Sequence, residues 1–358
     1  MVHRYLFCGI LAIAGWLGAA NAVAQPTVYE SEPNDTPLDA NPIAGAVRLY
    51  GSMQGKDQDG FLWTVTDDDA RKTWDFELHG IPGALTIVEL VKVQLTEDGG
   101  EVAAVDKIMK MGTRDGVTPS IHRGQLFDPG EYLLGLAYAG GPAQGGGIYR
   151  PPAVGLTFGE EPEHAEAPVD GTAAGAEDGG AHAWQFAIRE SGTLNVGKNP
   201  GGAEQREQAR AVRLGSYYAT YEPLGTAWYS FTFDDKSAGQ RWDIEIRSPI
   251  GRQLRARLVD ADGQGLVEGW ADSHGRILFP DLAPEPGSWY LELTTQEPGF
   301  IQAVFATAAG QRIDGEEAEP NNAFAQANRV EPGKAVTGRI NRADTADLFR
   351  FEIDETLA

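Results

Sequence analysis

Cysteine is almost missing from this sequence. Among 358 residues there is one, Cys8. It lies inside an N-terminal apolar run that we interpret below as an export signal, so the mature chain would contain none. Such a chain can form no disulfide bond and offers no thiol for catalysis.

Basic residues are also scarce. Lys and Arg number 29 against 52 Asp and Glu, which gives a formal net charge of −23. A protein that binds nucleic acid needs a basic surface to neutralise phosphates, so we exclude nucleic acid as a partner. The acidic balance is typical of a soluble protein that faces salt, cations or other secreted molecules. With 42% apolar residues the chain is not disordered as a whole and has material for two or three domains.

Long apolar runs are confined to the N-terminus. Arg4 is followed by the run Leu6–Gly18 and by the small-residue cleavage motifs Ala20-Asn21-Ala22 and Ala22-Val23-Ala24. The run is too short for a membrane span, which needs about 20 apolar residues, and no later run in the sequence is long enough. We therefore predict a signal peptide over residues 1–24, export to the periplasm or the medium, and no transmembrane segment.

Common catalytic motifs do not occur in the sequence. It has no Gly-x-Ser-x-Gly, no His-Glu-x-x-His, no P-loop and no Gly-x-Gly-x-x-Gly. The histidines after the signal are scattered, and we interpret each as solvated or hydrogen-bonded rather than as a catalytic base: His79, His122, His164, His182 and His274. We predict that this segment is not an enzyme and assign no catalytic residue.

Two acidic segments resemble each other closely. Residues 30–36 read Glu-Ser-Glu-Pro-Asn-Asp-Thr, and residues 317–322 read Glu-Ala-Glu-Pro-Asn-Asn. In each case a glycine, Gly51 or Gly338, stands 19 residues after the second glutamate. Two aspartates and a phenylalanine follow at similar spacing. These agreements indicate an internal repeat.

A middle copy lacks the acidic segment but shares later features. The matching pairs are Ala46–Leu49 with Ala211–Leu214, Trp74–Leu78 with Trp242–Ile246, Leu95–Gly99 with Leu258–Gly263, and Pro129–Leu133 with Pro286–Leu291. We predict a first module over residues 25–158, an acidic Gly/Ala-rich linker over 159–183, a second module over 184–308 and the start of a third over 309–358. The third module stops about where the second strand of the first module would end, and two strands cannot bury a core alone. We therefore expect the chain to be the N-terminal part of a longer protein.

Within each module the apolar residues alternate with polar ones. Phe61, Trp63 and Val65 show this period of two, as do Trp242, Ile244 and Ile246, and Asp-Gly or Pro-Gly turns bound the runs. This pattern predicts half-buried strands. Several short strands per module without a long amphipathic helix favour an all-β fold of tandem antiparallel β-sandwiches. Trp74 and Trp242 would fill equivalent core positions, and residues 67–69 would form an exposed hairpin loop.

The two acidic segments with their later Gly and Asp-x-(x)-Asp-x-Phe resemble the bacterial pre-peptidase C-terminal domain family, whose relatives include the collagen-binding domains of clostridial collagenases. The resemblance covers the first and third modules and reaches the second by internal similarity. It implies a jelly-roll-like β-sandwich that accompanies secreted enzymes without being catalytic. Some relatives bind calcium through the acidic segment and the Asp-containing turn, and some bind collagen or polysaccharide.

The residue types support a calcium site as well, because calcium takes six to eight oxygen ligands in flexible geometry. The first candidate set is Glu30, Glu32, Asn34, Asp35, Asp57 and Asp59; the second is Glu317, Glu319, Asn321, Asn322, Asp344 and Asp347. The middle module has Tyr221-Glu222-Pro223 instead, and we predict no metal there. The alternative interpretation is that both segments are solvated turns and caps.

Aromatic residues are dense in the second module. They are Tyr217, Tyr218, Tyr221, Trp228, Tyr229, Trp270 and Trp289. An exposed subset could stack on sugars or hold a peptide, so the expected partners are an extracellular or envelope protein or a polysaccharide. We interpret the chain as an exported, non-catalytic accessory, binding or spacer region. One alternative is the N-terminal region of a secreted hydrolase, such as a peptidase, whose catalytic domain lies beyond residue 358; a self-standing adhesion protein is another.

Overall fold

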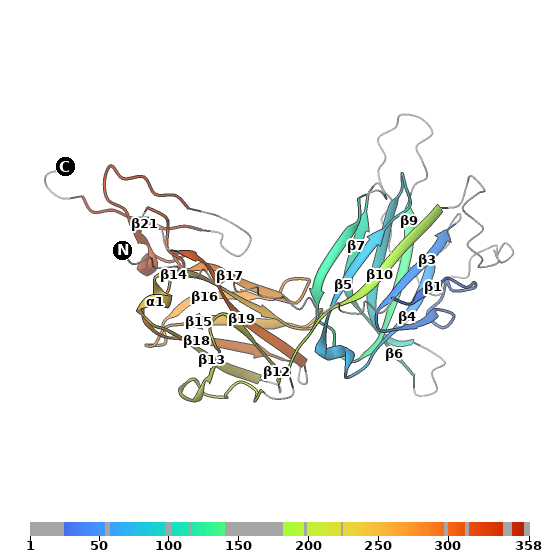
Figure 1. Ribbon diagram of the computed structural model, residues 1–358, viewed down its shortest axis with the longest axis horizontal. Helices are drawn as coiled ribbons and strands as arrows, with labels where there is room; N and C mark the ends of the chain where they lie inside the picture. Colours follow the sequence, from blue (N-terminus) through green and yellow to red (C-terminus); the bar gives the residue numbers. More distant parts are fainter. Residues whose placement is uncertain are drawn as a thin grey trace, which may run out of the picture.

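The fold is seen in a computed structural model of the chain. The structure describes residues 25–53, 58–96, 102–114, 116, 118–139, 182–196, 199–222, 225–296, 300–311, 315–338 and 346–353. These residues form two β-sandwiches in succession, followed by a short C-terminal segment (Figure 1). The predicted signal peptide and most of the predicted acidic linker lie outside the described residues.

The first sandwich consists of two five-stranded sheets. One has the order β1 (Thr27–Tyr29), β3 (Val47–Met53), β10 (His182–Thr193), β5 (Lys72–His79), β8 (Ser120–Gln125). The other has the order β2 (Asn41–Ala44), β4 (Asp59–Val65), β9 (Gly130–Ala139), β6 (Leu85–Leu95), β7 (Val102–Thr113). Strands β1 and β2 pair in parallel at the edges, and the other pairs are antiparallel.

The second sandwich has a five-stranded and a four-stranded sheet. The first has the order β11 (Arg210–Ala211), β13 (Gly225–Phe233), β18 (Gly287–Thr295), β15 (Leu254–Val259), β16 (Gly265–Trp270). The second has the order β12 (Ser216–Glu222), β19 (Phe300–Gln311), β14 (Gln240–Arg247), β17 (Arg276–Leu282). After it, β20 (Asn328–Arg329) and β21 (Phe349–Arg350) form a parallel pair. The helical turns are η1 (Asp69–Arg71), η3 (Arg206–Gln208), η4 (Phe324–Gln326) and α1 (Asp235–Ala238).

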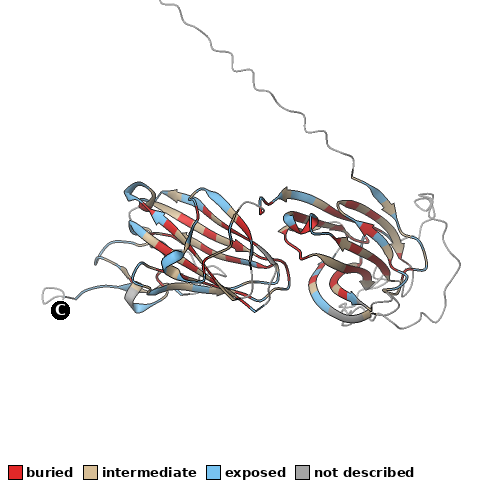
Figure 2. Ribbon diagram, turned by 90° about the horizontal axis from the view of Figure 1, so that it is seen from below, coloured by how far each residue is buried: buried red, intermediate tan, exposed pale blue. Residues whose placement is uncertain are grey.

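Alternating residues of the facing sheets build each core, as the period of two predicts (Figure 2). Phe61, Trp63 and Val65 are buried on β4, and the Trp63 ring packs edge-on against Trp74 at a centroid distance of 5.2 Å. The Pro-Gly elements turn the chain into β9 and β18, which begin at Gly130 and Gly287. The prediction of an all-β fold of sandwich modules is confirmed. No helix among the described residues has the length and apolar character needed to cross a membrane.

The boundary drawn between the modules needs correction. The strand β10 pairs with β3 and β5 of the first sandwich, although residues from 184 onward were predicted to belong to the second module. The predicted linker therefore falls between β9 and β10, two strands of the same sandwich, and β19 extends to Gln311, beyond the predicted end of the second module at residue 308. Alternation in β10 predicts a strand, but it does not say with which neighbours that strand pairs.

Trp74 and Trp242 lie in equivalent core positions, which confirms their prediction. Both are buried, and both strands that carry them have an irregular register next to the tryptophan. Each indole N–H donates to a backbone carbonyl five residues earlier, Asp69 O at 3.1 Å and Ser237 O at 2.8 Å. The tryptophans thus fix the turns that precede their strands.

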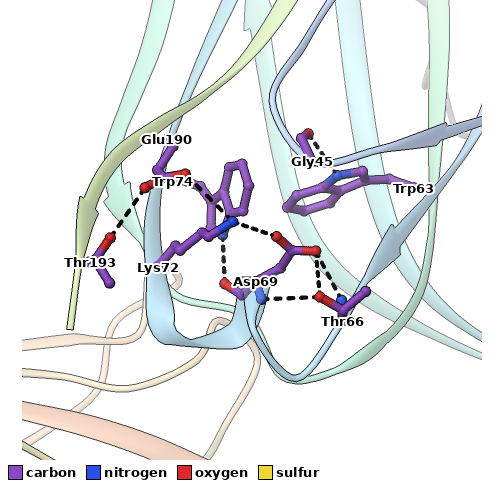
Figure 3. A network of polar contacts seen from close by, with 8 residues as sticks. All are labelled: Gly45, Trp63, Thr66, Asp69, Lys72, Trp74, Glu190 and Thr193. Carbon is purple, nitrogen blue, oxygen red and sulfur yellow. Dashed lines mark hydrogen bonds and ion pairs between the residues drawn. The ribbon is translucent and has the colours of Figure 1, made fainter. Parts of the chain in front are cut away.

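Residues 67–69 do not form the fully exposed loop that the sequence suggested. Asp67 and Asp68 are exposed, but Asp69 is buried and begins the helical turn η1 (Figure 3). Its carboxylate accepts hydrogen bonds from the Thr66 hydroxyl at 2.7 Å and from Lys72 Nζ at 2.9 Å. Burial by itself raises the pKa of Asp69, but these hydrogen bonds outweigh it and lower the pKa below its ordinary value of 3.8.

The two sandwiches contact each other directly. Leu126 and Pro249 form a backbone bridge, and Ile250 N donates to Leu126 O at 2.9 Å. Arg252 Nε donates to the buried carboxylate of Asp128 at 2.5 Å. These contacts join the turn after β8 to the turn after β14.

The lowered pKa of Asp69 predicts a specific loss of stability in acid. Its charged form is favoured in the folded state, so its contribution is present above pH 3.8 and disappears as the pH falls through the lower folded-state pKa. The variant Asp69→Asn should melt at a lower temperature than the wild type at pH 7, and the difference should shrink below about pH 4. Asp68→Asn, at an exposed neighbour, should melt like the wild type; an equal effect of both variants would contradict the role of Asp69.

Candidate metal centres

The first acidic segment is anchored beside the start of β4. Glu30 directly follows β1, whose parallel pairing with β3 continues in a hydrogen bond from Glu30 N to Tyr50 O of 3.0 Å. Farther along the segment, the Asn41 side chain accepts from Ser31 N at 2.7 Å and donates to Ser31 O at 2.9 Å. Asp59 is the first residue of β4, which pairs with β2. The sheet edges thus bring residues far apart in the sequence together.

Three carboxylates gather at this point. One oxygen each from Glu30, Glu32 and Asp59 lies within 4.8 Å of the other two. Asp59 is fully buried. Glu30 Oε2, Glu32 Oε1 and Asp59 Oδ1 are all shielded from solvent. A concentration of negative charge in a partly desolvated place is costly unless a cation compensates it.

A different donor holds the second oxygen of each carboxylate. Glu30 Oε1 accepts from Ser52 N at 2.7 Å, and Glu32 Oε2 accepts from Asn34 N at 3.0 Å. Asp59 Oδ2 accepts from the indole N–H of Trp184 at 2.5 Å. The hydrogen bond to one oxygen thus fixes the orientation of each carboxylate, as hydrogen bonds commonly do for carboxylate ligands of metal ions.

Asn34, in the same segment, carries an amide oxygen of a kind that calcium can bind. Its side chain has no exposed surface, and neither Oδ1 nor Nδ2 makes a hydrogen bond in the described structure. A buried amide without partners costs about 1–3 kcal/mol. A bound cation would compensate this cost at Oδ1.

A second cluster has the same construction. Glu317, Glu319 and Asp347 each place a carboxylate oxygen within 4.8 Å of the other two. Asn321 is fully buried, its backbone N donates to Glu319 Oε2 at 3.0 Å, and its Nδ2 lies 3.4 Å from Glu317 Oε2. Rotation of this amide group by 180° would exchange Nδ2 for Oδ1, so that the oxygen would face a cation bound by the carboxylates. The second buried asparagine therefore lies beside its carboxylates.

The backbone around the two clusters also agrees. Asn328 clasps Ala318 through the same pair of hydrogen bonds that Asn41 makes with Ser31, at 2.5 and 2.9 Å. The peptide bonds Glu32–Pro33 and Glu319–Pro320 are both cis. The second acidic segment also rests on the second sandwich, because Ala283 N donates to Glu319 O at 2.7 Å.

Steric contacts explain why glycine stands at positions 51 and 338, each 19 residues after the second glutamate of its acidic segment. A Cβ atom on Gly51 would lie 2.1 Å from Glu30 Oε2 and 2.2 Å from the Trp184 ring. A Cβ atom on Gly338 would lie 2.3 Å from Glu317 Oε2. Only glycine lets the first glutamate of each cluster approach the neighbouring backbone so closely.

The donor set suits a hard cation of calcium's size. All donors are carboxylate or amide oxygens, with no sulfur or imidazole in either group. Calcium binds oxygen at 2.3–2.6 Å, so ligands on opposite sides of the ion lie about 4.6–5.2 Å apart. The separation of up to 4.8 Å within each cluster fits this range. Water or further carbonyls would complete the six to eight ligands.

The structure brings together part of each predicted ligand set. Glu30, Glu32 and Asp59 meet, as do their counterparts in the second cluster, whereas Asp57 and Asp344 lie outside the described residues. Asp35 is outside the first group, and its Oδ1 accepts from Gln58 N at 3.2 Å. Asn322 is half-buried next to Asn321. Trp184 was missed, because nothing in the sequence links it to Asp59.

The aromatic residues that the sequence analysis singled out in the second sandwich differ in burial, and Tyr218 and Trp228 are half-buried. Tyr229 and Trp289 are buried in the core. Tyr217, Tyr221 and Trp270 are exposed, by 43, 56 and 63%. Tyr217 and Tyr221 lie on β12, and Trp270 ends β16 in the other sheet. The exposed residues therefore do not share one sheet.

Comparisons with known proteins give only distant similarities. No family model and no curated protein sequence matches the chain. Among solved structures, the pre-peptidase C-terminal domain of a Bacillus anthracis collagenase is similar over 27% of this chain and 92% of its own, at 16% identity and a TM-score of 0.23. The PBSX exported protein XepA is similar over 72% of this chain and 84% of its own, at 6% identity and a TM-score of 0.20.

A β-glucuronidase from Ruminococcus gnavus is similar over 72% of this chain and 37% of its own, at 12% identity and a TM-score of 0.18. Identities and scores this low assign neither a family nor an activity. The pre-peptidase likeness that the sequence suggested is thus supported only as a weak resemblance of fold, and no enzyme function is established.

The steric role of Gly51 can be tested by adding one methyl group. Gly51→Ala should lower the stability of the first sandwich by about 1–3 kcal/mol, because the new Cβ displaces Glu30 or Trp184. Thermal and urea unfolding would measure the loss. Gly265→Ala is the control, since a Cβ there meets nothing within 4 Å. Equal stability of Gly51→Ala and the wild type would show that the close approach is not required.

Proposed function

We propose that the chain is an exported, calcium-stabilised pair of β-sandwiches that serves as a non-catalytic accessory, binding or spacer region. The observation that carries this proposal is the recurrence of one arrangement at two places: three converging carboxylates, one buried asparagine and one sterically required glycine. The same spacing in the sequence supports an internal repeat. The partners that we propose are extracellular or envelope proteins or polysaccharides.

Calcium would have a structural role in this account. Glu30, Glu32, Asn34 and Asp59 would hold the first ion, and Glu317, Glu319, Asn321 and Asp347 the second. The positive charge would offset the repulsion among the carboxylates. It would also tie each acidic segment to its neighbouring strands, since the ligands come from elements far apart in the sequence.

Titration calorimetry can count the calcium ions. The wild-type chain should bind two, Asp59→Asn should retain only the second site and Asp347→Asn only the first, while the double variant should bind none. Asp67→Asn removes one exposed carboxylate away from the clusters and should still bind two. Absence of binding at millimolar calcium would contradict the proposal and favour solvated turns.

Thermal melting provides a second measurement of the same claim. At calcium concentrations about 100 times the dissociation constant, the ion stabilises the folded state by about 2.7 kcal/mol. For a sandwich of this size that corresponds to a rise in melting temperature of roughly 5–10 °C. Asp59→Asn should abolish the rise for the first sandwich. A rise of equal size in this variant would place the stabilising ion elsewhere.

Export has a separate test. When the chain is produced in a bacterium with residues 1–24 in place, the product should leave the cytoplasm and begin at Val23 or Gln25. N-terminal sequencing of the cytoplasmic, periplasmic and medium fractions would show this. Arg4→Glu, which removes the positive charge before the apolar run, should slow processing. An unprocessed product confined to the cytoplasm would contradict export.

A further inference from the structure

A cleft of about 550 Å³ lies where the two sandwiches meet. Strands β6, β7 and β8 of the first sandwich line it with Glu89, Met109 and His122, among others. The turn between β16 and β17 of the second sandwich contributes Ser273 and His274. Side chains from both sandwiches therefore face one space.

Three side chains with soft or borderline donor atoms converge in this cleft. His122 Nδ1 lies 3.2 Å from the sulfur of Met109, which is itself 7% exposed. The rings of His122 and His274 are 4.6 Å apart between centroids, at an interplanar angle of 71°. Two imidazole rings and a thioether sulfur thus lie side by side, carried by β8, the facing turn and β7.

We propose that Met109, His122 and His274 form a binding site for copper(I). Metal bonds of about 2.0 Å to imidazole nitrogen and about 2.3 Å to sulfur place these two atoms roughly 3.0–3.1 Å apart when the bonds meet at a right angle, and slightly farther apart at a wider angle. Two imidazoles that share an ion near a right angle have ring centroids about 4.5 Å apart. Both separations in the cleft agree with these values.

The surroundings of His274 leave one nitrogen available to the ion. Its Nδ1 lies 3.3 Å from Ser273 Oγ and 4.0 Å from a carboxylate oxygen of Asp272. When Nδ1 carries the proton and donates to Ser273 Oγ, Nε2 is left as the nitrogen that would bind a metal, as in histidine ligands whose second nitrogen is hydrogen-bonded. Asp272 also accepts from His274 N at 2.8 Å, so the turn that carries the ring is itself held.

The chemistry of the cleft favours a soft monovalent ion over a hard divalent one. Thioether sulfur prefers copper(I), whereas calcium and magnesium take oxygen. The carboxylate in the cleft, Glu89, is engaged by Lys110 at 2.7 Å and Lys107 at 3.6 Å. Its charge is therefore already balanced. Because the ligands come from both sandwiches, a bound ion would also join them.

An anaerobic competition titration tests this site. The purified chain, in millimolar calcium to fill any oxygen sites, should take one copper(I) ion per molecule from bicinchoninate. Met109→Leu and His274→Gln should each weaken binding by at least about tenfold. X-ray absorption should show one sulfur and two nitrogen ligands in the wild type and no sulfur in Met109→Leu.

Two matched variants control for general effects. Met111→Leu changes a buried methionine on the same strand, and His79→Gln removes a histidine that contacts Glu77 instead. Both should bind copper as the wild type does. The proposal is overturned if the wild type takes no copper(I), or if either Met109→Leu or His274→Gln binds copper(I) as tightly as the wild type does. His274 lies on a turn, so its variant keeps the test valid even if Met109→Leu unfolds.

Discussion

The close approach of three carboxylates at the end of a sheet is the constraint on which much of this structure depends. Like charges less than 5 Å apart repel by an amount on the order of a few kcal/mol per pair at a protein surface. The fold holds Glu30, Glu32 and Asp59 in this arrangement with backbone N–H groups and an indole. It also excludes a side chain at Gly51. A bound cation would offset the repulsion among the carboxylates and would connect the strands that carry them.

Through Trp184 the same cluster reaches the middle of the first sandwich. The indole that donates to Asp59 lies on β10, which pairs with both β3 and β5. The strand ends at Thr193, and Leu194 N donates to Arg71 O at 2.7 Å before the chain continues to the second sandwich. The first acidic cluster, the sheet and the chain between the sandwiches are therefore connected by a short series of contacts.

Local patterns in the sequence predicted a large part of the fold. Alternation gave the strands around Trp63 and Trp242, and the matching tryptophans occupy equivalent core positions because each fixes the turn before its strand. The spacing of Glu, Gly and Asp singled out the carboxylates that meet in the two clusters. These features depend on neighbouring residues or on a single steric contact, which the sequence records directly.

Long-range pairing could not be predicted in the same way. The strand β10 was assigned to the wrong sandwich, since its alternation is compatible with any sheet that has an open edge. Ala46–Leu49 and Ala211–Leu214 look alike, yet the first enters β3 whereas the second spans the end of β11 and the turn before β12. The approach of Trp184 to Asp59, and of His274 to His122, arises only when separate elements pack.

The most direct test of the central claim is a crystal structure determined in calcium, with anomalous scattering to locate the ions. This account predicts one peak bonded to Glu30, Glu32 and Asp59 and another bonded to Glu317, Glu319 and Asp347, each at 2.3–2.6 Å from oxygen. Absence of both peaks at millimolar calcium, with the carboxylates still within 5 Å of one another, would contradict it.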